Sequence, residues 1–200
     1  MTNELLRGLP RYFDNDQLAR LAAARVGIAG VGGLGSNAAL MLARSGVGGF
    51  TLVDCDVVEA SNLNRQQYWP DDVGRPKVDA LRDRLLDLNP ELEIESRQIR
   101  LDARNTPEIL QKCPLWVEAF DEPQAKAMLV ELVMLSGRKC ASASGMGGYG
   151  GPPMTRRKLG NLILVGDFSS DILRHPPLAP RVTQAAALLA DAILEFILDS

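Results

Sequence analysis

One short motif constrains the fold of this chain more than any other feature. Gly30, Gly32 and Gly35 follow the spacing Gly-x-Gly-x-x-Gly. The apolar run before them, residues 26–30, predicts a strand, and residues 36–45 after them predict a helix. A second apolar run, residues 50–54, predicts another strand. Strand, helix and strand in this order form a βαβ unit, which implies a parallel sheet with a right-handed crossover.

Each glycine of this motif has its own physical role. Gly30 permits a tight turn, Gly32 lets the backbone approach a phosphate, and Gly35 lets helix and strand pack closely. The start of the helix presents free N–H groups and a partial positive charge to an anion. Asp54 follows about 20 residues later, where such folds place the acid that binds the ribose hydroxyls. We therefore predict a bound nucleotide; the alternative is a glycine turn used only for packing.

The rest of the chain continues the alternation of helices and strands. The apolar spacing predicts helices at residues 76–88, 106–112 and 123–135, and strands at residues 92–99, 115–120 and 139–144. After these come a loop rich in Gly and Pro, a strand and an amphipathic helix, at residues 145–153, 162–165 and 181–198. The pattern is typical of an α/β fold with a doubly wound, mostly parallel, Rossmann-like sheet. We expect one domain over residues 1–200, with its core in 25–145 and the loop, strand and closing helix in 146–200.

Length and composition narrow the functional class. A chain of 200 residues has room for about one domain of ~150 residues, which excludes a hydride-transfer enzyme with a full separate substrate domain. The formal charge of −3 and the lack of a basic run argue against nucleic-acid binding. We find no signal-peptide pattern and no apolar run approaching ~18 residues, so we expect a soluble, cytoplasmic protein.

The cysteines and the single histidine offer little chemistry. Cys55, Cys113 and Cys140 lie far apart, and the chain contains no Cys-x-x-Cys pair. A structural zinc site needs about four Cys or His ligands at paired spacings, so we expect no zinc. Each cysteine is expected to be a small buried apolar residue. His175 lies in a predicted loop, where we expect a surface or packing role rather than catalysis.

The segment after Asp54 favours a triphosphate over NAD. Residues 54–68 are dense in amides and include Arg65, just outside the carboxyl end of the second strand, where ligands bind in open α/β sheets. Lys77 lies in the first turn of the next predicted helix, where the helix dipole disfavours a cation. NAD needs no such pair of cations, whereas a triphosphate that releases pyrophosphate does.

These segments resemble the ThiF/MoeB/HesA family, the bacterial relatives of ubiquitin-activating enzymes, and most closely its short ThiF type of thiamine biosynthesis. The resemblance covers roughly residues 11–145 and rests on motifs at residues 30–36, 53–56, 61–66, 74–77 and 89–90. It implies adenylation by ATP of the C-terminal glycine carboxylate of a small β-grasp sulfur carrier that ends in Gly-Gly, with release of pyrophosphate. It also implies Mg²⁺ and a homodimer.

The resemblance implies roles for individual residues. Arg65, Lys77 and Asp121 would be the catalytic residues, with Asp121 helping to hold Mg²⁺. Asn64, Arg65 and Lys77 would bind and neutralise the phosphates, and Asp54 would bind the ribose. The expected nucleotide-binding residues are Gly30, Gly32, Gly33, Gly35, Asp54, Asp56, Asn62, Asn64, Arg65, Gln66 and Lys77.

The chain also departs from the family pattern. Glu122 and Lys126 stand where the family has an Asn and a later Arg after the acidic residue. Longer relatives carry two Cys-x-x-Cys pairs and a reactive Cys, so this sequence indicates adenylation and says little about sulfur transfer. Relatives lend an N-terminal arginine to the phosphate site of a dimer partner, for which Arg7, Arg11 and Arg20 are the candidates here.

Two other functions remain open. One is an NAD-binding oxidoreductase or redox sensor, which the cations around the glycine motif disfavour. The other is a pseudo-enzyme that only binds nucleotide and carrier, a hypothesis motivated by the missing cysteines and the altered segment after Asp121. The glycine loop at residues 145–152 follows a strand at the nucleotide end of the sheet. We hypothesise that it admits the extended Gly-Gly tail of the carrier.

Overall fold

Strands and helices alternate along the residues that the structure describes, 3–172 and 174–199. This computed structural model has the following strands: β1 (Arg25–Ala29), β2 (Gly49–Asp54), β3 (Glu93–Gln98), β4 (Leu115–Glu118), β5 (Lys139–Ala143), β6 (Thr155–Leu159) and β7 (Leu162–Gly166). The α-helices are α1 (Glu4–Gly8), α2 (Asn15–Ala23), α3 (Gly33–Arg44), α4 (Lys77–Leu88), α5 (Thr106–Leu110), α6 (Pro123–Leu135) and α7 (Ala179–Leu198). Short 3-10 turns are η1 (Leu9–Arg11), η2 (Ala60–Asn62) and η3 (Pro70–Asp72).

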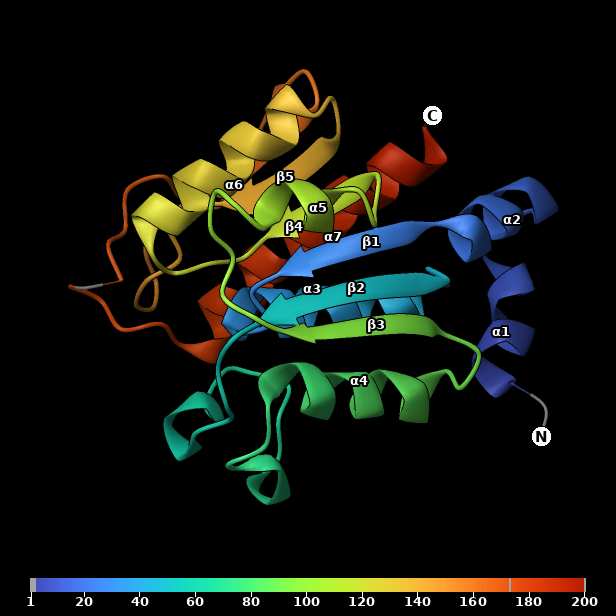
Figure 1. Cartoon of the computed structure of the whole chain (residues 1–200), viewed down its shortest axis with the longest axis horizontal. Helices are drawn as coiled ribbons and strands as arrows, with labels where there is room; N and C mark the ends of the chain where they lie inside the picture. Colours follow the sequence, from blue (N-terminus) through green and yellow to red (C-terminus); the bar gives the residue numbers. More distant parts are fainter. Residues whose placement is uncertain (1–2, 173, 200) are drawn as a thin grey trace.

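All of these strands belong to one sheet, in the order β3-β2-β1-β4-β5-β7-β6. Neighbouring strands are parallel except for β6, which runs antiparallel to β7. Helices cover both faces of the sheet (Figure 1). The order reverses at β1, with β2 on one side and β4 on the other, as in doubly wound folds. The predicted α/β fold with a mostly parallel sheet is therefore confirmed.

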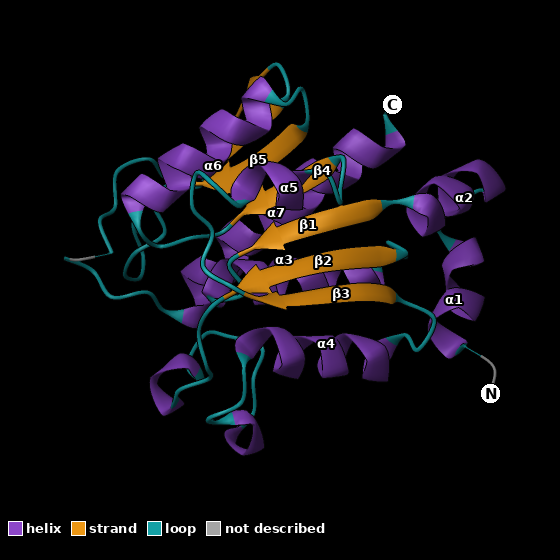
Figure 2. Ribbon diagram, viewed as in Figure 1, coloured by secondary structure: helices purple, strands orange, loops and turns teal. Residues whose placement is uncertain are grey.

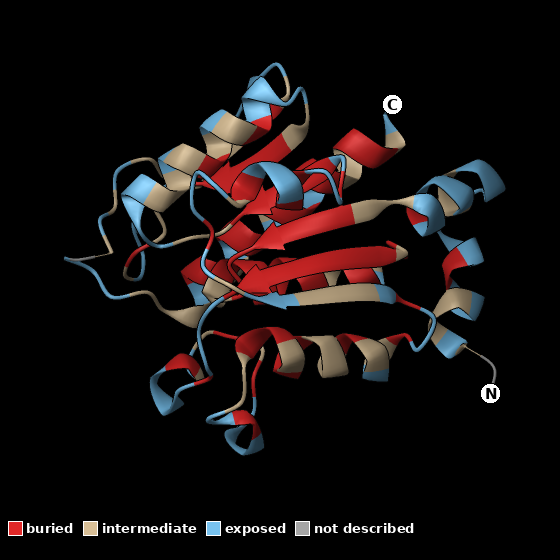
Figure 3. Ribbon diagram, in the orientation of Figure 1, coloured by how far each residue is buried: buried red, intermediate tan, exposed pale blue. Residues whose placement is uncertain are grey.

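The core consists of two apolar layers, one on each face of the sheet. On one face α3, α4 and α7 contribute Leu42, Leu81 and Leu189, which are fully buried. On the other face α5 and α6 contribute Ile109 and Leu129. Burial is concentrated in the central strands β1 and β2, while β3 at the sheet edge is partly exposed (Figure 3).

The parallel strands bring their carboxyl ends to one edge of the sheet. Figure 2 shows the arrowheads of β1, β2 and β3 pointing to the same edge, with α1 and α2 at the opposite edge. The glycine turn, the connection after β2 and the loops after β4, β5 and β7 all follow from this edge. In the described residues no helix is long and apolar enough to cross a membrane.

Three elements were not predicted. Helices α1 and α2 precede the glycine motif, and α2 has a capping box in which Asp14 accepts from the backbone N–H of Gln17 at 2.8 Å. Strand β6 has the sequence Thr-Arg-Arg-Lys-Leu with every residue exposed, so it lacks the apolar alternation that indicates a strand. It forms because its backbone pairs with β7 at the edge of the sheet. Helix α3 begins at Gly33 rather than at Ser36.

The glycine turn depends on a close approach between β1 and α3. Gly30 has a φ of +87°, which side chains disfavour. A Cβ atom added to Gly35 would lie 1.9 Å from the carbonyl oxygen of Gly30. The first and third glycines therefore have the turn and packing roles that the motif predicts.

We predict that Gly35→Ala lowers the free energy of unfolding by about 3 kcal/mol or more, because the added Cβ meets backbone that cannot move aside. Gly8→Ala is the matched control, since nothing lies within 4 Å of the added Cβ. It should change stability by no more than about 1 kcal/mol. Urea unfolding of both variants measures the difference, and similar stabilities for the two would contradict the close approach.

Candidate nucleotide-binding site

Hydrogen bonds fix the glycine turn to the end of β2. Asp54 is 9% exposed, and its carboxylate accepts from the backbone N–H of Val31 at 2.8 Å and of Asp56 at 2.9 Å. The hydroxyl of Tyr68 donates to the carbonyl oxygen of Val31 at 2.7 Å and approaches that of Lys77 at 3.3 Å. Burial raises the pKa of Tyr68, so this hydroxyl remains a donor. The turn, β2 and the start of α4 thus form one fixed unit.

The start of α3 presents backbone donors at this turn. Its N-cap is Gly32, and no described side chain caps it, so the first N–H groups are suited to an anion. A Cβ at Gly32 would have the amide nitrogen of Gln66 as its nearest neighbour, at 3.6 Å. A Cβ at Gly33 would lie 2.9 Å from Val182 and 3.5 Å from the Arg65 stem. Val182 of α7 therefore flanks the turn, a contact that its place on an apolar helix face does not reveal.

The connection between β2 and α4 is anchored on α3. Asn37 donates to the backbone oxygen of Arg65 at 2.9 Å and accepts from the side chain of Gln67 at 2.7 Å. The hydroxyl of Ser36 accepts from the backbone N–H of Gln67 at 3.1 Å. These contacts place Arg65 beside the start of α3, as the motif predicts.

The amides of this connection differ in what they can offer a ligand. Asn64 is exposed and accepts from the Arg65 guanidinium at 2.8 Å. Asn62 is buried, and its oxygen accepts from the backbone N–H of Glu59 at 3.0 Å, so it caps its own turn. Gln66 is buried beside Gly32, and its Oε1 has no hydrogen-bond partner within the described part of the chain. Gln66 and Asn64 are thus better placed than Asn62 to meet a nucleotide.

Lys77 is buried and paired. It is the first residue of α4, is 7% exposed, and donates to Asp56 at 2.8 Å. That hydrogen bond lowers the pKa of Asp56 against the opposing effect of partial burial. The position of the lysine in the first helical turn is as predicted, and Asp56 compensates for the unfavourable helix dipole there.

Acidic residues cluster after β4. Asp121 and Glu122 are exposed, and Glu122 pairs with Arg100 at 2.6 Å. Glu118 is fully buried and accepts from the backbone N–H of Phe120 at 2.8 Å. It also accepts from Lys126, in the position where the family has an arginine. Glu118 is a site residue that the sequence does not reveal, because a single acidic residue inside a predicted strand gives no sign that it fixes the loop after the strand.

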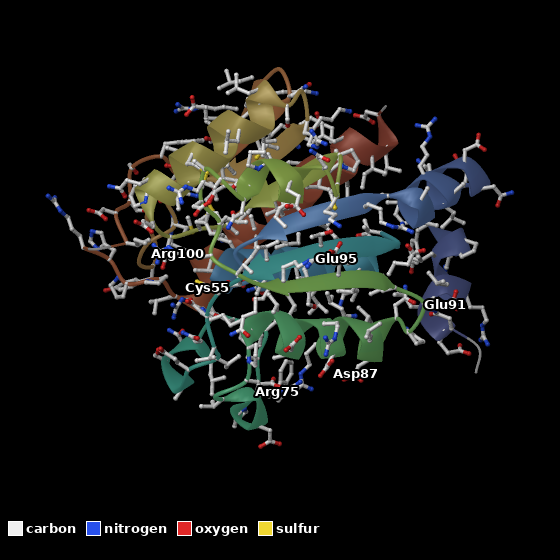
Figure 4. The ribbon with its side chains drawn as sticks, in the orientation of Figure 1. Cys55, Arg75, Asp87, Glu91, Glu95 and Arg100 are labelled. Atoms are coloured by element: carbon white, nitrogen blue, oxygen red, sulfur yellow. The ribbon has the colours of Figure 1, made fainter. Side chains whose placement is uncertain are left out.

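The cysteine prediction is right for two of three residues. Cys113 and Cys140 are buried, and burial raises the pKa of Cys140, which keeps it a thiol. Cys55 is exposed, contrary to expectation, because it lies just beyond the end of β2. Figure 4 shows Cys55 and Arg100 at the same edge of the sheet. Although the residue as a whole is exposed, partial desolvation of its thiol and neighbouring Asp56 raise the pKa of Cys55, which disfavours a reactive thiolate.

A pocket of about 320 Å³ lies between the glycine loop, residues 145–152, and a second segment that contributes residues 169–171 and 174–175. The backbone N–H of Gly148 donates to the oxygen of Pro176 at 3.1 Å, which holds the two segments together. His175 is exposed and lines this pocket, where its backbone packs against Gly147. The segments that line the pocket leave the sheet at the same edge as the glycine turn.

Among the N-terminal arginines, the structure places Arg20 away from this edge. Its guanidinium donates to the carbonyl oxygen of Leu198 at the end of α7, at 2.9 Å. Arg7 pairs with Glu4 at 3.1 Å, and Arg11 is exposed. All three lie in or beside α1 and α2, which Figure 2 shows at the opposite end of the sheet. None of them reaches the glycine turn of its own chain.

Comparison with known proteins gives a consistent result. The sequence model of the ThiF family matches residues 5–162. The chain is 39% identical over 139 residues to an adenylyltransferase and sulfurtransferase uba4 of Emericella nidulans, which corresponds to 69% of this chain and 29% of that protein. It is 38% identical over 119 residues to the SAMP-activating enzyme E1 of Haloferax volcanii, or 59% of this chain and 44% of that protein. The chain thus spans less than half the length of these curated relatives.

Solved structures share the fold along nearly the whole chain. An ATP complex of E. coli tRNA N6-threonylcarbamoyladenosine dehydratase superposes with a TM-score of 0.88 at 22% identity, over 98% of this chain and 95% of that one. An ATP complex of E. coli MccB superposes with a TM-score of 0.71 at 23% identity, over 90% and 57%. Identities this low show a common fold.

We predict that Lys77→Met, which keeps the apolar stem, raises the pKa of Asp56 toward its ordinary value of about 3.9. Because the folded pKa lies below the unfolded one, the pair stabilises the protein above about pH 4 and loses its effect as the pH falls through the lowered pKa. NMR titration of the carboxyl carbon measures the change. Lys112→Met, which removes a lysine from a surface pair with Glu95, is the control. An unchanged Asp56 pKa in Lys77→Met would contradict the assignment.

Proposed function

Because this chain belongs to the ThiF family, we propose that it is an ATP-dependent adenylyltransferase that activates the C-terminal glycine carboxylate of a small ubiquitin-like carrier protein. The observation that carries the proposal is that Arg65 lies beside the uncapped start of α3, while Lys77 begins α4, which Tyr68 links to Val31 of the same glycine turn. This concentration of positive charge fits a triphosphate. The uba4 relative is named an adenylyltransferase and sulfurtransferase and the Haloferax relative a SAMP-activating enzyme, and both names support the same activity.

The proposed reaction needs no general base. The carboxylate of the carrier has a pKa of about 3.5 and is ionised at neutral pH. One of its oxygens attacks the α-phosphorus of ATP, the bond from that phosphorus to the bridging oxygen breaks, and pyrophosphate leaves with the bond electrons. The products are an acyl adenylate and pyrophosphate. A chain whose one histidine, His175, lies in a surface loop can therefore carry out this chemistry.

Charge neutralisation is the main catalytic requirement. Negative charge accumulates on the leaving pyrophosphate, and fixed positive groups aimed at it lower the barrier. Arg65 is half-buried and held by nearby oxygens of Ser61 and Asn64. Lys77 is held by Asp56. Both cations are thus positioned in advance, and phosphate oxygens would share them with these carboxylate and amide partners.

Asp121 offers a single carboxylate of the kind that suits Mg²⁺. Magnesium in such sites takes one or two carboxylates together with substrate phosphates and water. Asp121 is an exposed carboxylate in the loop after β4, a chemistry that suits the ion. When bound there, Mg²⁺ would neutralise phosphate charge. Glu118 fixes the backbone of Phe120 immediately before Asp121, which restricts where that carboxylate can lie.

The pocket beside the glycine loop suits the tail of the carrier. Its lining includes Gly147, Gly148 and Gly151, and glycines in the lining leave room for an extended backbone. We propose that a Gly-Gly tail passes through this pocket toward the nucleotide. A sulfur carrier of the thiamine pathway is the partner that the short ThiF type favours, and a homodimer is the assembly. The thiamine-pathway carrier and the homodimer are parts of the same proposal, and the resemblance to the short ThiF type supports them.

The activity is tested by ATP–pyrophosphate exchange that depends on an added carrier ending in Gly-Gly. We expect Lys77→Ala and Arg65→Ala to lower the exchange rate by about 100-fold or more, while Lys112→Ala leaves it unchanged. Normal exchange in either site variant would contradict the mechanism.

Two other results would favour a different function. ATP binding without exchange with any such carrier would indicate a pseudo-enzyme. A thermal shift with NADH but not with ATP and Mg²⁺ would indicate an NAD-binding protein.

The tail pocket is tested by filling it. We expect Gly148→Leu to lower carrier-dependent exchange by about 10-fold or more with little change in ATP affinity, because Gly148 lines the pocket and the added side chain obstructs an extended backbone. Gly137→Leu is the strain control, since Gly137 and Gly148 have similar positive φ angles of 71° and 74° and the Cβ position of Gly137 faces open space. Unchanged exchange in Gly148→Leu would exclude this route for the tail.

A further inference from the structure

A buried arginine lies between the glycine loop and the start of α7. Arg181 is in the first turn of this helix, where the dipole disfavours a cation, and it is 5% exposed. Its guanidinium forms an ion pair with Asp167, whose side chain is fully buried. Burying a cation costs free energy unless a counter-charge and hydrogen bonds compensate for the lost water. The groups that contact Arg181 therefore indicate its role.

Arg181 and Asp167 together connect three segments. One guanidinium nitrogen of Arg181 donates to the carbonyl oxygens of Gly150 at 2.6 Å and Pro152 at 3.3 Å, both in the glycine loop. Asp167 accepts from the backbone N–H groups of Ser169 at 2.8 Å and Ser170 at 2.7 Å. The glycine loop, the turn after β7 and the start of α7 therefore share one buried junction.

The surroundings of the Asp167 carboxylate favour its ionised form. Burial alone would raise its pKa, but the N–H and hydroxyl groups of Ser170, the N–H of Ser169 and the Arg181 guanidinium outweigh burial and lower it. The hydroxyl of Ser170 also accepts from the backbone N–H of Gly147 at 2.9 Å. Both walls of the 320 Å³ pocket are thus tied to the same ion pair.

The residue after Arg181 reaches the nucleotide turn. A Cβ added to Gly33 would lie 2.9 Å from Val182, so Val182 is in direct contact with the first residue of α3. Two consecutive residues of α7 therefore contact, respectively, the loop of the tail pocket and the turn of the nucleotide site. The first turn of α7 therefore links the two.

We propose that Arg181 is a positioning residue that holds the glycine loop at a fixed distance from the start of α3, so that a carboxylate entering through the pocket meets the α-phosphorus. This proposal rests on the function proposed above. It assigns to the Arg181–Asp167 pair a role in substrate geometry in addition to its role in folding. Approach geometry matters because small displacements of a reacting group cost large factors in rate.

The shape of the guanidinium group explains why position 181 holds an arginine rather than a lysine. Its planar fork reaches Asp167 and two backbone oxygens at once, whereas a lysine ammonium is a point charge that cannot hold all three in the same plane. Arg181→Lys therefore keeps the ion pair with Asp167 and removes the hold on Gly150 and Pro152. Arg156→Lys is the matched control, because Arg156 also bridges two partners on α7, Asp191 and Glu195, away from the pocket.

The first measurement is hydrogen–deuterium exchange of the whole chain. In Arg181→Lys we expect the amides of Gly147 and Gly148, which donate to Ser170 and Pro176, to exchange about 10-fold faster or more. The amides of α3 should keep their protection, and Arg156→Lys should leave the glycine loop unchanged. Unaltered exchange at the glycine loop in Arg181→Lys would overturn the proposal, whether or not the chain proves to be an adenylyltransferase.

The second measurement separates positioning from stability. In carrier-dependent pyrophosphate exchange, Arg181→Lys should raise the KM for the carrier by about 10-fold or more and leave the affinity for ATP within about two-fold. A purely structural role would lower the melting temperature and the active fraction, and so kcat, with KM unchanged, and that result would overturn the proposal. Absence of exchange in the wild-type chain would count against the proposed function, and the deuterium measurement then decides the role of Arg181.

Discussion

The structure depends on how closely α3 can approach the end of β1. The gap between the carbonyl oxygen of Gly30 and the α-carbon of Gly35 leaves no room for a side chain. This contact directs the first N–H groups of α3 at the sheet edge, where a nucleotide binds in such folds. Asp54 and Tyr68 then hold Val31 from both sides, by its N–H and its carbonyl oxygen. Every other part of the site is placed relative to this turn.

Charged groups at the site are paired before any ligand arrives. Lys77 pairs with Asp56, and at the end of β4 the buried Glu118 pairs with Lys126 of α6. An unpaired buried charge would cost several kcal/mol, so these pairs let the cations stay near the site at tolerable cost. The same arrangement keeps them oriented. An incoming triphosphate therefore meets positive groups whose positions are already set, which is what electrostatic catalysis requires.

The sequence was sufficient for the α/β fold and for the glycine turn. The glycine spacing predicted the turn and the βαβ unit, and the segment after Asp54 predicted Arg65 beyond the second strand and Lys77 in the first turn of a helix, because these features depend on local sequence. It was insufficient where tertiary contacts decide. Strand β6 has no apolar pattern and exists only through pairing with β7. Val182 contacts Gly33 from a helix about 150 residues away, a proximity that no local pattern encodes.

The same distinction applies to single side chains. Asn62 was expected at the nucleotide but caps its own turn, since an amide in a tight loop competes for nearby backbone groups. Glu118 and Arg181 were not singled out, because charged residues in predicted strands and helices are usually exposed and only the folded chain buries them. The roles of the predicted site residues toward ATP remain predictions that follow from this geometry.

The most direct test of the central claim is a crystal structure of the chain with Mg²⁺ and a non-hydrolysable ATP analogue. We predict phosphate density at the start of α3, with Arg65 and Lys77 in contact with phosphate oxygens and the ribose beside Asp54. Phosphates bound elsewhere, or a triphosphate at the turn that touches neither cation, would contradict the account.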